Sequence, residues 1–207
     1  MRALTGPVST TLCERSIDMN EREWVETFAP KLNDEIRAAD ASLSVVTGEK
    51  LPYAREIHHY HDSGDIKTSS MKYETDILLI ERDSKECWIP RVIVETKCRG
   101  SISTHDAITY SHKAFTHRQV HPYLRYGILV AERGHFPLPG RLFRHGTQFD
   151  FMLSWKGNKP TTNELKDFVE IALKEVDASR IMQEIIFESR KKGRKHYSVL
   201  HKELKVK

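Results

Sequence analysis

Long hydrophobic runs and cysteine are both scarce in this sequence of 207 residues. No window approaches the roughly 18 consecutive apolar residues of a membrane span. The first 16 residues lack the apolar core of a signal peptide. Cys13, Cys87 and Cys98 show no metal-ligand spacing, and such a sparse, odd set is typical of reduced thiols in a cytosol. We therefore expect a cytoplasmic protein without a membrane partner.

The nucleotide-binding motif G-x-x-x-x-G-K-[ST] is also missing, which excludes a fused helicase or translocase of that class. Apolar residues make up 39% and charged residues 30%, as in a globular protein. The length suffices for one domain with a sizeable core. We expect a single domain over 1–207, with an N-terminal arm at 1–17 and a basic tail at 188–207. The net charge of +4 permits a nucleic-acid partner without requiring one.

Two short apolar runs dominate the middle of the chain. Ile77–Ile80 and Val92–Val94 are rich in β-branched residues and have polar residues on either side, so both are predicted as buried strands. The sequence Asp83-Ser84 between them is typical of a turn.

Charged residues stand at the ends of these runs. Asp76 precedes the first run, and Glu95 follows the second, with Lys97 two residues further on. A strand has a side-chain period of two, so Glu95 and Lys97 point to the same face. If the strands pair, Asp76 comes alongside, and two carboxylates and one ammonium meet at the end of an apolar sheet.

This grouping predicts a metal site. Two carboxylates close together destabilise each other, and one nearby Lys relieves only part of the repulsion. A divalent cation removes the conflict, and Mg²⁺ typically takes one or two carboxylates together with several waters. The Lys97 ammonium can then orient a water or stabilise charge on a phosphate. A bare Glu-x-Lys is commonly an ion pair on a solvated strand end, but the strand-like context favours a functional site.

Asp76, eighteen intervening residues and Glu95-Thr96-Lys97 resemble the signature of the PD-(D/E)XK nuclease superfamily, which includes many restriction endonucleases. The resemblance extends over residues 20–131 in the order of elements, although Thr75 stands where the family usually has Pro. It implies an α/β fold with a mixed central sheet flanked by helices and an αβββαβ core. It also implies catalysis by Asp76, Glu95 and Lys97, with Mg²⁺ held by Asp76 and Glu95.

The other core elements are predicted from periodicity and from breaking residues. They are a helix from Asp18 or Asn20 to Ala39, a strand at Tyr53–Tyr60, a polar loop at 62–71, a helix at His105–Val120 and a strand at Arg125–Ala131. This alternation predicts an α/β fold with a mixed sheet. In the second helix we expect a thin apolar face with Ile108 and Phe115, to which Ala107, Ser111 and Ala114 are added less firmly. The outer face is expected to carry His112, Lys113, His117 and Arg118.

Further elements are expected after residue 131. They are a loop at 132–146, an added strand at Thr147–Trp155, a helix after the capping sequence Thr161–Glu164 and a second C-terminal helix with Ile181, Ile185 and Ile186.

Additional site residues are less firmly marked. Family members often carry an acid on the first helix, and Glu35 or Glu21 lies on or beside the apolar stripe of that helix. Basic residues that we expect to contact DNA are Arg99, Lys113, Arg118, Arg141, Arg144, Arg190 and Lys191. A solvated loop at 132–146 and a solvated tail are equally open alternatives. His58, His59 and His61 lack partners at a known zinc spacing, so DNA contact or a polar strand end is the preferred interpretation.

The sequence thus favours a Mg²⁺-dependent DNA endonuclease, and a type II restriction enzyme in particular. Such an enzyme acts on double-stranded DNA as a homodimer, because cutting both strands of a palindrome needs two sites related by a two-fold axis. Three alternatives stay open: a structure-specific nuclease for Holliday junctions or repair, a non-catalytic DNA-binding module with this fold, and an unrelated α/β protein with a chance Glu-x-Lys.

Overall fold

The structure, a computed structural model, describes residues 19–83, 86–132, 137–188 and 191–206. Its helices are α1 (Glu21–Ala39), α2 (Thr104–Val120), α3 (Gly140–His145) and α4 (Thr162–Glu188). Its strands are β1 (Leu43–Val46), β2 (Lys50–Tyr60), β3 (Ile66–Glu74), β4 (Ile77–Arg82), β5 (Trp88–Cys98), β6 (Arg125–Ala131) and β7 (Phe151–Ser154).

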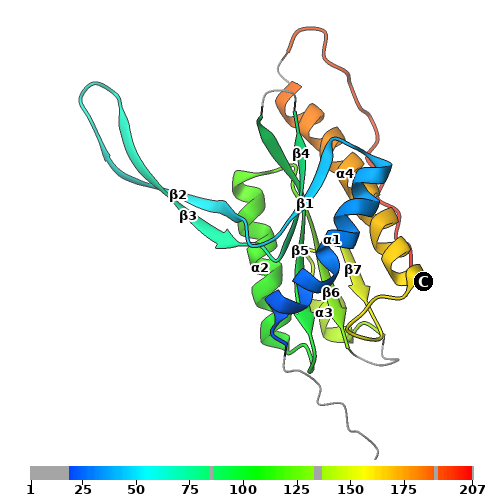
Figure 1. Cartoon of the computed structure of the whole chain (residues 1–207). Helices are drawn as coiled ribbons and strands as arrows, with labels where there is room; N and C mark the ends of the chain where they lie inside the picture. The colour runs from blue at the N-terminus through cyan, green and yellow to red at the C-terminus, as the bar shows by residue number, and fades with distance from the viewer. Residues whose placement is uncertain (1–18, 84–85, 133–136, 189–190, 207) are drawn as a thin grey trace, which may run out of the picture.

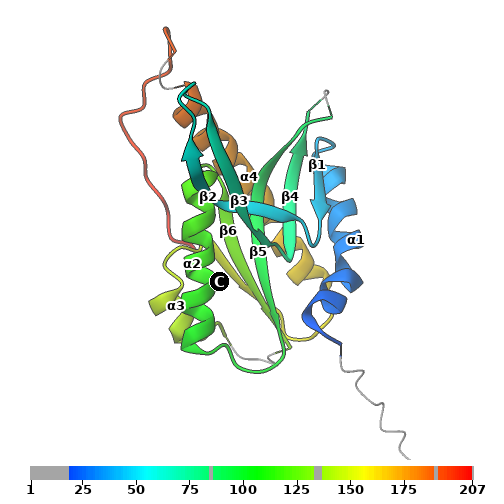
Figure 2. The same cartoon turned by 90° about the vertical axis from the view of Figure 1, so that its left-hand side faces the viewer.

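A five-stranded sheet of order β1-β4-β5-β6-β7 forms the centre of the molecule. Helices α1 and α4 cover one face, and α2 with α3 covers the other (Figure 1, Figure 2). The pairs β1–β4 and β4–β5 are antiparallel, whereas β5–β6 and β6–β7 are parallel. The expected α/β fold with a mixed sheet flanked by helices is confirmed.

The two apolar runs are the central strands β4 and β5, as predicted. Leu79 and Val94 belong to the core beneath α1 and α4, whereas Leu78 and Ile93 belong to the core beneath α2. A strand that is buried on both faces needs apolar side chains at every position rather than at alternate positions. This explains why the runs are continuous.

Helices α1 and α2 both begin at the end of the sheet where β5 ends (Figure 2). Asn20 caps α1 in a capping box with Glu23, and Ser103 caps α2 in a capping box with Asp106. Side chains satisfy backbone N–H groups that have no partner within the first turn of a helix. Of the two starts predicted for the first helix, Asn20 is confirmed as the capping residue. Helix α2 begins one residue before the predicted His105, and Pro122 lies just past its end.

An aromatic cluster fixes α1 and α4 on their face of the sheet. Trp24 and Phe28 of α1 pack against Trp155, which in turn contacts Phe168 of α4. The Trp24 Nε1–H also donates a 2.5 Å hydrogen bond to the carbonyl of Asn158. Because Trp24 lies one turn after the start of α1, this packing also fixes the start of that helix beside the end of β5.

Strands β2 and β3 pair only with each other and form a hairpin, residues 50–74, that projects from the body (Figure 1). The prediction of Tyr53–Tyr60 as the first core strand is therefore wrong, because the first strand of the sheet is β1. The polar loop expected at 62–71 is also wrong, since β3 begins at Ile66. Side chains from Arg55 to Lys67 are exposed on both faces, so no apolar alternation marks these strands in the sequence.

With the hairpin left out, the order is α1, β1, β4, β5, α2, β6. This is the helix, three strands, helix and strand expected of an αβββαβ core. The hairpin is an insertion between the first two of these strands.

The C-terminal half differs from expectation in three places. The predicted loop at 132–146 contains the short helix α3 among its described residues, and the added strand β7 is shorter than Thr147–Trp155. The two predicted C-terminal helices are one helix, α4, whose buried side is a continuous stripe. No Gly or Pro interrupts residues 162–188, so nothing in the sequence ends the helix between them.

Helix α2 confirms only the small residues of the predicted apolar face. Its buried residues are Ala107, Ser111, Ala114 and His117, whereas Ile108 and Phe115 are about half exposed. Small side chains let α2 lie close to the sheet, which leaves the larger apolar ones outside. Burial lowers the pKa of His117 to about 4, so this histidine is neutral and part of the core rather than of the outer face.

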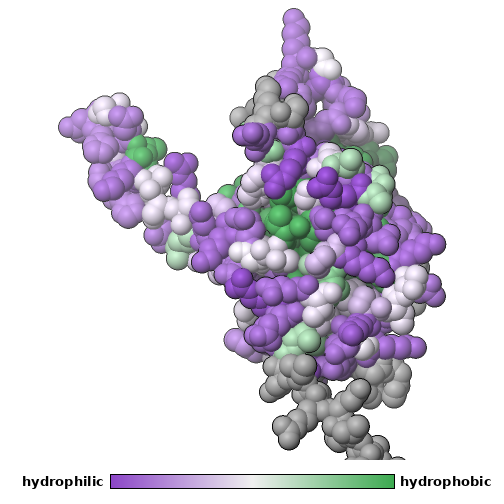
Figure 3. Space-filling model, in the orientation of Figure 1, coloured by the Kyte–Doolittle hydropathy of each residue, from purple (hydrophilic) through white to green (hydrophobic). Residues whose placement is uncertain are grey.

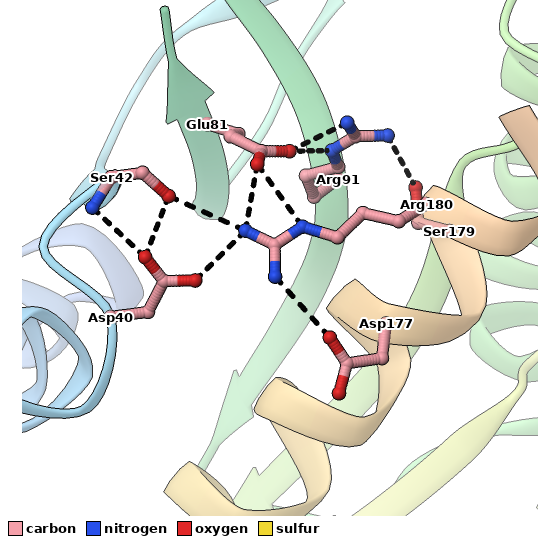
Figure 4. Close-up of polar contacts among 7 residues, drawn as sticks. All are labelled: Asp40, Ser42, Glu81, Arg91, Asp177, Ser179 and Arg180. Carbon is pink, nitrogen blue, oxygen red and sulfur yellow. Dashed lines mark hydrogen bonds and ion pairs between the residues drawn. The ribbon is translucent and has the colours of Figure 1, made fainter. Parts of the chain in front are cut away.

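At the opposite end of the sheet, an ionic network joins α4 to the strands (Figure 4). The Arg180 guanidinium contacts Glu81 Oε1 at 2.7 Å and Asp40 Oδ2 at 2.8 Å. Arg91 contacts the other oxygen of Glu81, Oε2, at 2.5 Å. Hydrogen bonds from Ser42 and Arg180 lower the pKa of Asp40 to about 2. This network is structural and lies away from the Glu95–Lys97 end of β5.

The ends of the chain add little to the described fold. The N-terminal arm expected at 1–17 lies outside the described residues. Residues 194–206 contain no helix or strand, and their side chains are exposed. In the described ranges, every helix is too short or too polar to cross a membrane.

Candidate functional site

The structure brings Asp76 and Glu95 together at the junction of β4 and β5. Ile77 pairs with Val94 in the antiparallel ladder, so the next step of the register places Asp76 opposite Glu95. Glu95 is only 1% exposed, and Asp76 is half-buried. Two carboxylates thus lie at one point of the sheet, as the sequence predicted.

Asp76 is held in place by the strand beside it. Its Oδ2 accepts hydrogen bonds from the Thr96 backbone N–H at 2.7 Å and from the Thr96 hydroxyl at 2.9 Å. Burial nevertheless raises the pKa of Asp76, because the two hydrogen bonds offset only part of the lost hydration. Both hydrogen bonds from Thr96 end on Oδ2, which leaves Oδ1 as the oxygen to face a ligand.

Glu95 is fixed from two sides. Its Oε1 accepts a 2.6 Å hydrogen bond from the Tyr126 hydroxyl of β6, and its Oε2 lies 3.0 Å from Lys113 Nζ of α2. Burial raises the pKa of the Glu95 carboxyl, Lys113 opposes this rise, and the charge of Asp76 adds to it. Burial also raises the pKa of Tyr126 well above its ordinary value, so its hydroxyl stays protonated and donates.

Lys97 points to the start of α1 rather than to either carboxylate. Its Nζ lies 2.8 Å from Glu21 Oε1, and this hydrogen bond raises the pKa of Lys97. The charges of Asp106 and Asp76 also raise it. The Lys97 side chain is 29% exposed and its ammonium stays charged, and Glu21 orients it.

The structure distinguishes between the two acids proposed on the first helix. Glu21 contacts Lys97 and therefore belongs to the site. Glu35 is exposed, and it lies 14 residues further along α1, about 21 Å by helical rise. The structure does not bring Glu35 to the cluster.

Lys113 was expected on the outer face of α2, and this placement is wrong. Its Nζ lies over the rings of Tyr110 and Tyr73, at 5.4 and 5.8 Å from their centroids, besides contacting Glu95. Burial raises the pKa of Tyr110, and the charges of Glu21, Glu95 and Asp76 raise it further, so this phenol is neutral. Asp106, Tyr110 and Lys113 repeat at helical spacing and therefore share one face of α2, which the packing of that helix turns toward the site.

The donor set suits Mg²⁺. Across the described ranges, no group of three or more His, Cys, Asp and Glu side chains is placed to hold a metal. Mg²⁺ needs only one or two carboxylates and keeps several waters, and it suits hard oxygen ligands. Asp76 and Glu95 provide two such ligands, and the raised pKa of both carboxyls is what a nearby cation would relieve.

The other proposed DNA contacts are scattered. Arg99 lies 2.6 Å from Glu132, and Arg118 forms an ion pair with Asp150 and donates to the Gln148 carbonyl. Arg118 therefore ties α2 to the segment before β7, and these contacts are structural.

Three further candidates lie in different places. Arg141 and Arg144 are exposed on α3. Lys191 contacts Glu188 at the end of α4. Arg190 lies outside the described residues. The described members of this set do not gather into one surface with the carboxylates.

The thiol of Cys98, which ends β5 next to the site, favours its protonated form. Burial raises the pKa of its thiol to about 11, and the nearby Glu132 carboxylate adds to the effect. The thiol is therefore protonated and unreactive at neutral pH.

No model of a known protein family matches the chain, and no curated protein sequence shows a significant match to it.

Proposed function

We propose that this protein is a Mg²⁺-dependent DNA endonuclease, and most specifically a type II restriction endonuclease of the PD-(D/E)XK superfamily. The observation that carries the proposal is Glu95, a carboxylate that is 1% exposed at the end of a central strand, opposite Asp76. Burying two acids together is unfavourable unless they serve a cation or a reaction. The order of the core elements and the Glu-x-Lys signature support the same proposal.

In this proposal Asp76 and Glu95 hold the metal ion. When bound, Mg²⁺ polarises the scissile phosphate and lowers the pKa of a bound water. The chain itself does the positioning: Thr96 orients Asp76, and Tyr126 with Lys113 orients Glu95.

Lys97 would act on the attacking water or on the phosphate. Its ammonium stays protonated beside Glu21, so it donates hydrogen bonds and stabilises negative charge. Glu21 is a positioning residue, because it contacts Lys97 and not the carboxylate pair. The proposed products are a 5′-phosphate and a 3′-hydroxyl.

The test is cleavage of plasmid and phage DNA by the purified protein, with Mg²⁺ and with chelator, followed by sequencing of the ends. A restriction enzyme gives discrete fragments with one common end sequence. Asp76→Ala and Lys97→Ala should abolish cutting, and Lys166→Ala, an exposed lysine of α4, serves as the control. Ca²⁺ in place of Mg²⁺ should permit binding with little cutting.

Other results would favour the alternatives. Cutting of branched DNA only would favour a structure-specific nuclease, and binding without cutting would favour a non-catalytic module. A fully active Lys97→Ala would contradict the site assignment. Homodimer formation on duplex DNA follows from the restriction-enzyme proposal and is measured by sedimentation with and without DNA.

A further inference from the structure

The hairpin at 50–74 is rooted directly beside the candidate site. Leu51 is 3% exposed in the core under α2, and its carbonyl lies 3.4 Å from His117 Nε2. Tyr73 stacks on Tyr53 with ring centroids 3.7 Å apart, and its ring is perpendicular to that of His117. Lys113, which contacts Glu95, lies over the same Tyr73 ring. A ligand that reaches Glu95 along this wall therefore meets the hairpin.

Beyond this root the hairpin is a two-stranded ribbon whose surface is mostly hydrophilic (Figure 1, Figure 3). Its longer strand has 11 residues, which corresponds to about 36 Å at the usual rise. Side chains from Arg55 to Lys67 are all exposed, so the outer part buries nothing against the body. A ribbon of this length adds little to the core, which favours a role in binding.

One face of the ribbon carries a row of hydrogen-bonding groups that continues from its root. Tyr73, Ser69 and Lys67 point to this face by the strand period of two, with the apolar Met71 between Tyr73 and Ser69. His58 Nε2 lies 3.0 Å from the Ser69 hydroxyl, and His59 pairs across the ladder with Lys67. The row thus leads outward from the site wall and presents imidazole, hydroxyl and ammonium groups.

The charge of the ribbon argues against simple attraction to phosphate. Residues 50–74 contain four Lys and Arg residues, Lys50, Arg55, Lys67 and Lys72, and four acids, Glu56, Asp62, Asp65 and Glu74. A surface that binds DNA without regard to sequence needs an excess of cations. Base edges in the major groove instead offer both donors and acceptors, so their readers carry both kinds of group.

From these observations we propose that the hairpin enters the major groove of a duplex bound at the site and reads base edges there. This inference rests on the proposed function. The major groove, about 12 Å wide, admits a two-stranded β-ribbon. Lys67, His58 and Ser69 would face the bases, with the carboxylates over the backbone next to the groove. The hairpin is then the sequence-reading element, distinct from the cutting site.

The experiment compares the discrimination of wild-type protein and hairpin variants between specific and scrambled duplexes. The specific sequence comes from the cut ends, or from selection out of a pool of randomised duplexes if the protein binds without cutting. Lys67→Ala and His58→Ala should each reduce the preference for the specific duplex by about 5- to 150-fold. Binding to the scrambled duplex should change little. Lys166→Ala removes the same charge as Lys67→Ala on the far side of the sheet and should leave the preference unchanged.

Each other outcome overturns the inference in an identifiable way. Unchanged discrimination in both variants, with wild-type cutting intact, would refute the hairpin's role and leave the nuclease proposal standing. An equal loss of binding to both duplexes with a weaker salt dependence would mean phosphate contact instead. A change in oligomeric state with the preference retained would mean that the hairpin binds a second copy. Absence of both cutting and binding by the wild type would remove both proposals.

Discussion

Asp76 and Glu95 carry charges that the folded chain does not favour. Burial raises the pKa of both carboxyls, so each binds a proton more readily in the folded chain than in the unfolded chain. For such acids, stability is lost as pH rises from the unfolded pKa through the folded pKa. The metal-free protein at neutral pH therefore bears an electrostatic penalty at its own site.

Asp76→Asn should raise the melting temperature of the metal-free protein at neutral pH, because the amide oxygen still accepts from Thr96 and carries no charge. For a chain of this size, each kcal/mol gained raises Tm by about 2–4 °C. The difference should shrink as pH falls through the folded pKa of Asp76, since the wild-type carboxyl then becomes protonated. Thermal unfolding at several pH values measures both effects.

Addition of Mg²⁺ gives the complementary result. The ion should raise the Tm of the wild type and have less effect on Asp76→Asn, because binding to the folded state alone is stabilising. Asp34→Asn, at an exposed acid of α1, is the matched control and should keep the wild-type response. Equal Mg²⁺ responses in all three proteins would contradict the metal site.

Under the proposed nuclease function, Lys113→Met should move the acid limb of the pH profile of the cleavage rate to higher pH. Lys113 opposes the rise in the pKa of Glu95, so its loss makes the ionised carboxylate harder to form. Lys113→Arg keeps the charge and should keep the limb near its wild-type position. The test is to measure cleavage rates across pH at saturating Mg²⁺. An acid limb at the wild-type pH in Lys113→Met would contradict the coupling between Lys113 and Glu95.

The candidate site residues differ in whether a local pattern in the sequence marks them. Asp76, Glu95 and Lys97 could be identified because each stands at the end of a local apolar run. Lys113 and Tyr126 could not, since their contacts with Glu95 depend on how α2 and β6 pack onto β5. Those contacts join residues 18 and 31 positions apart.

At the scale of elements, Arg180 joins α4 to β4 and to the segment after α1. Arg180→Ala should lower the stability by about 1–3 kcal/mol, because charged hydrogen-bond partners are left uncompensated. Lys174→Ala removes an exposed pair with Glu170 on the same helix and should cost less than about 0.5 kcal/mol. Thermal or urea unfolding measures both.

The pH dependence of this effect has a defined sign. The pKa of Asp40 is depressed to about 2, so its contribution is present above the unfolded pKa and is lost as pH falls toward 2. The difference in the free energy of unfolding between wild type and Arg180→Ala should therefore become smaller in acid. A difference in stability that stays constant as pH falls toward 2 would show that the ion pair with Asp40 contributes nothing.

Elements were predictable where one pattern dominated the sequence. The central strands and the starts of α1 and α2 follow from apolar runs and capping residues. The hairpin was misplaced because its strands are exposed on both faces and show no alternation. The buried face of α2 was predicted only in part because, apart from His117, it consists of small residues, which carry little hydrophobic signal.

At the scale of the whole molecule, the contribution of the basic tail to DNA binding is tested separately from the site. Truncation after Ser189 removes Arg190, Lys191, Lys192, Arg194 and Lys195. If these residues bind phosphates, DNA affinity should fall in the truncated protein. The slope of log affinity against log salt should also become shallower, by about 0.9 for each phosphate that the tail neutralises. An unchanged slope would mean that the tail does not take part.

The neck of the hairpin, formed by Gly48, Glu49 and Thr75, affects how freely the hairpin can be altered by mutation. The chain leaves and re-enters the sheet at one place, where the Thr75 N–H donates to the Glu49 carbonyl at 2.9 Å and the Gly48 N–H donates to the Thr75 carbonyl at 3.0 Å. Since β1 and β4 are already paired neighbours, a ribbon of another length or sequence can be grafted at this neck without rearranging the core. Under the proposed roles of these two parts, the hairpin could change without disturbing Asp76 and Glu95, so recognition and chemistry would be separable.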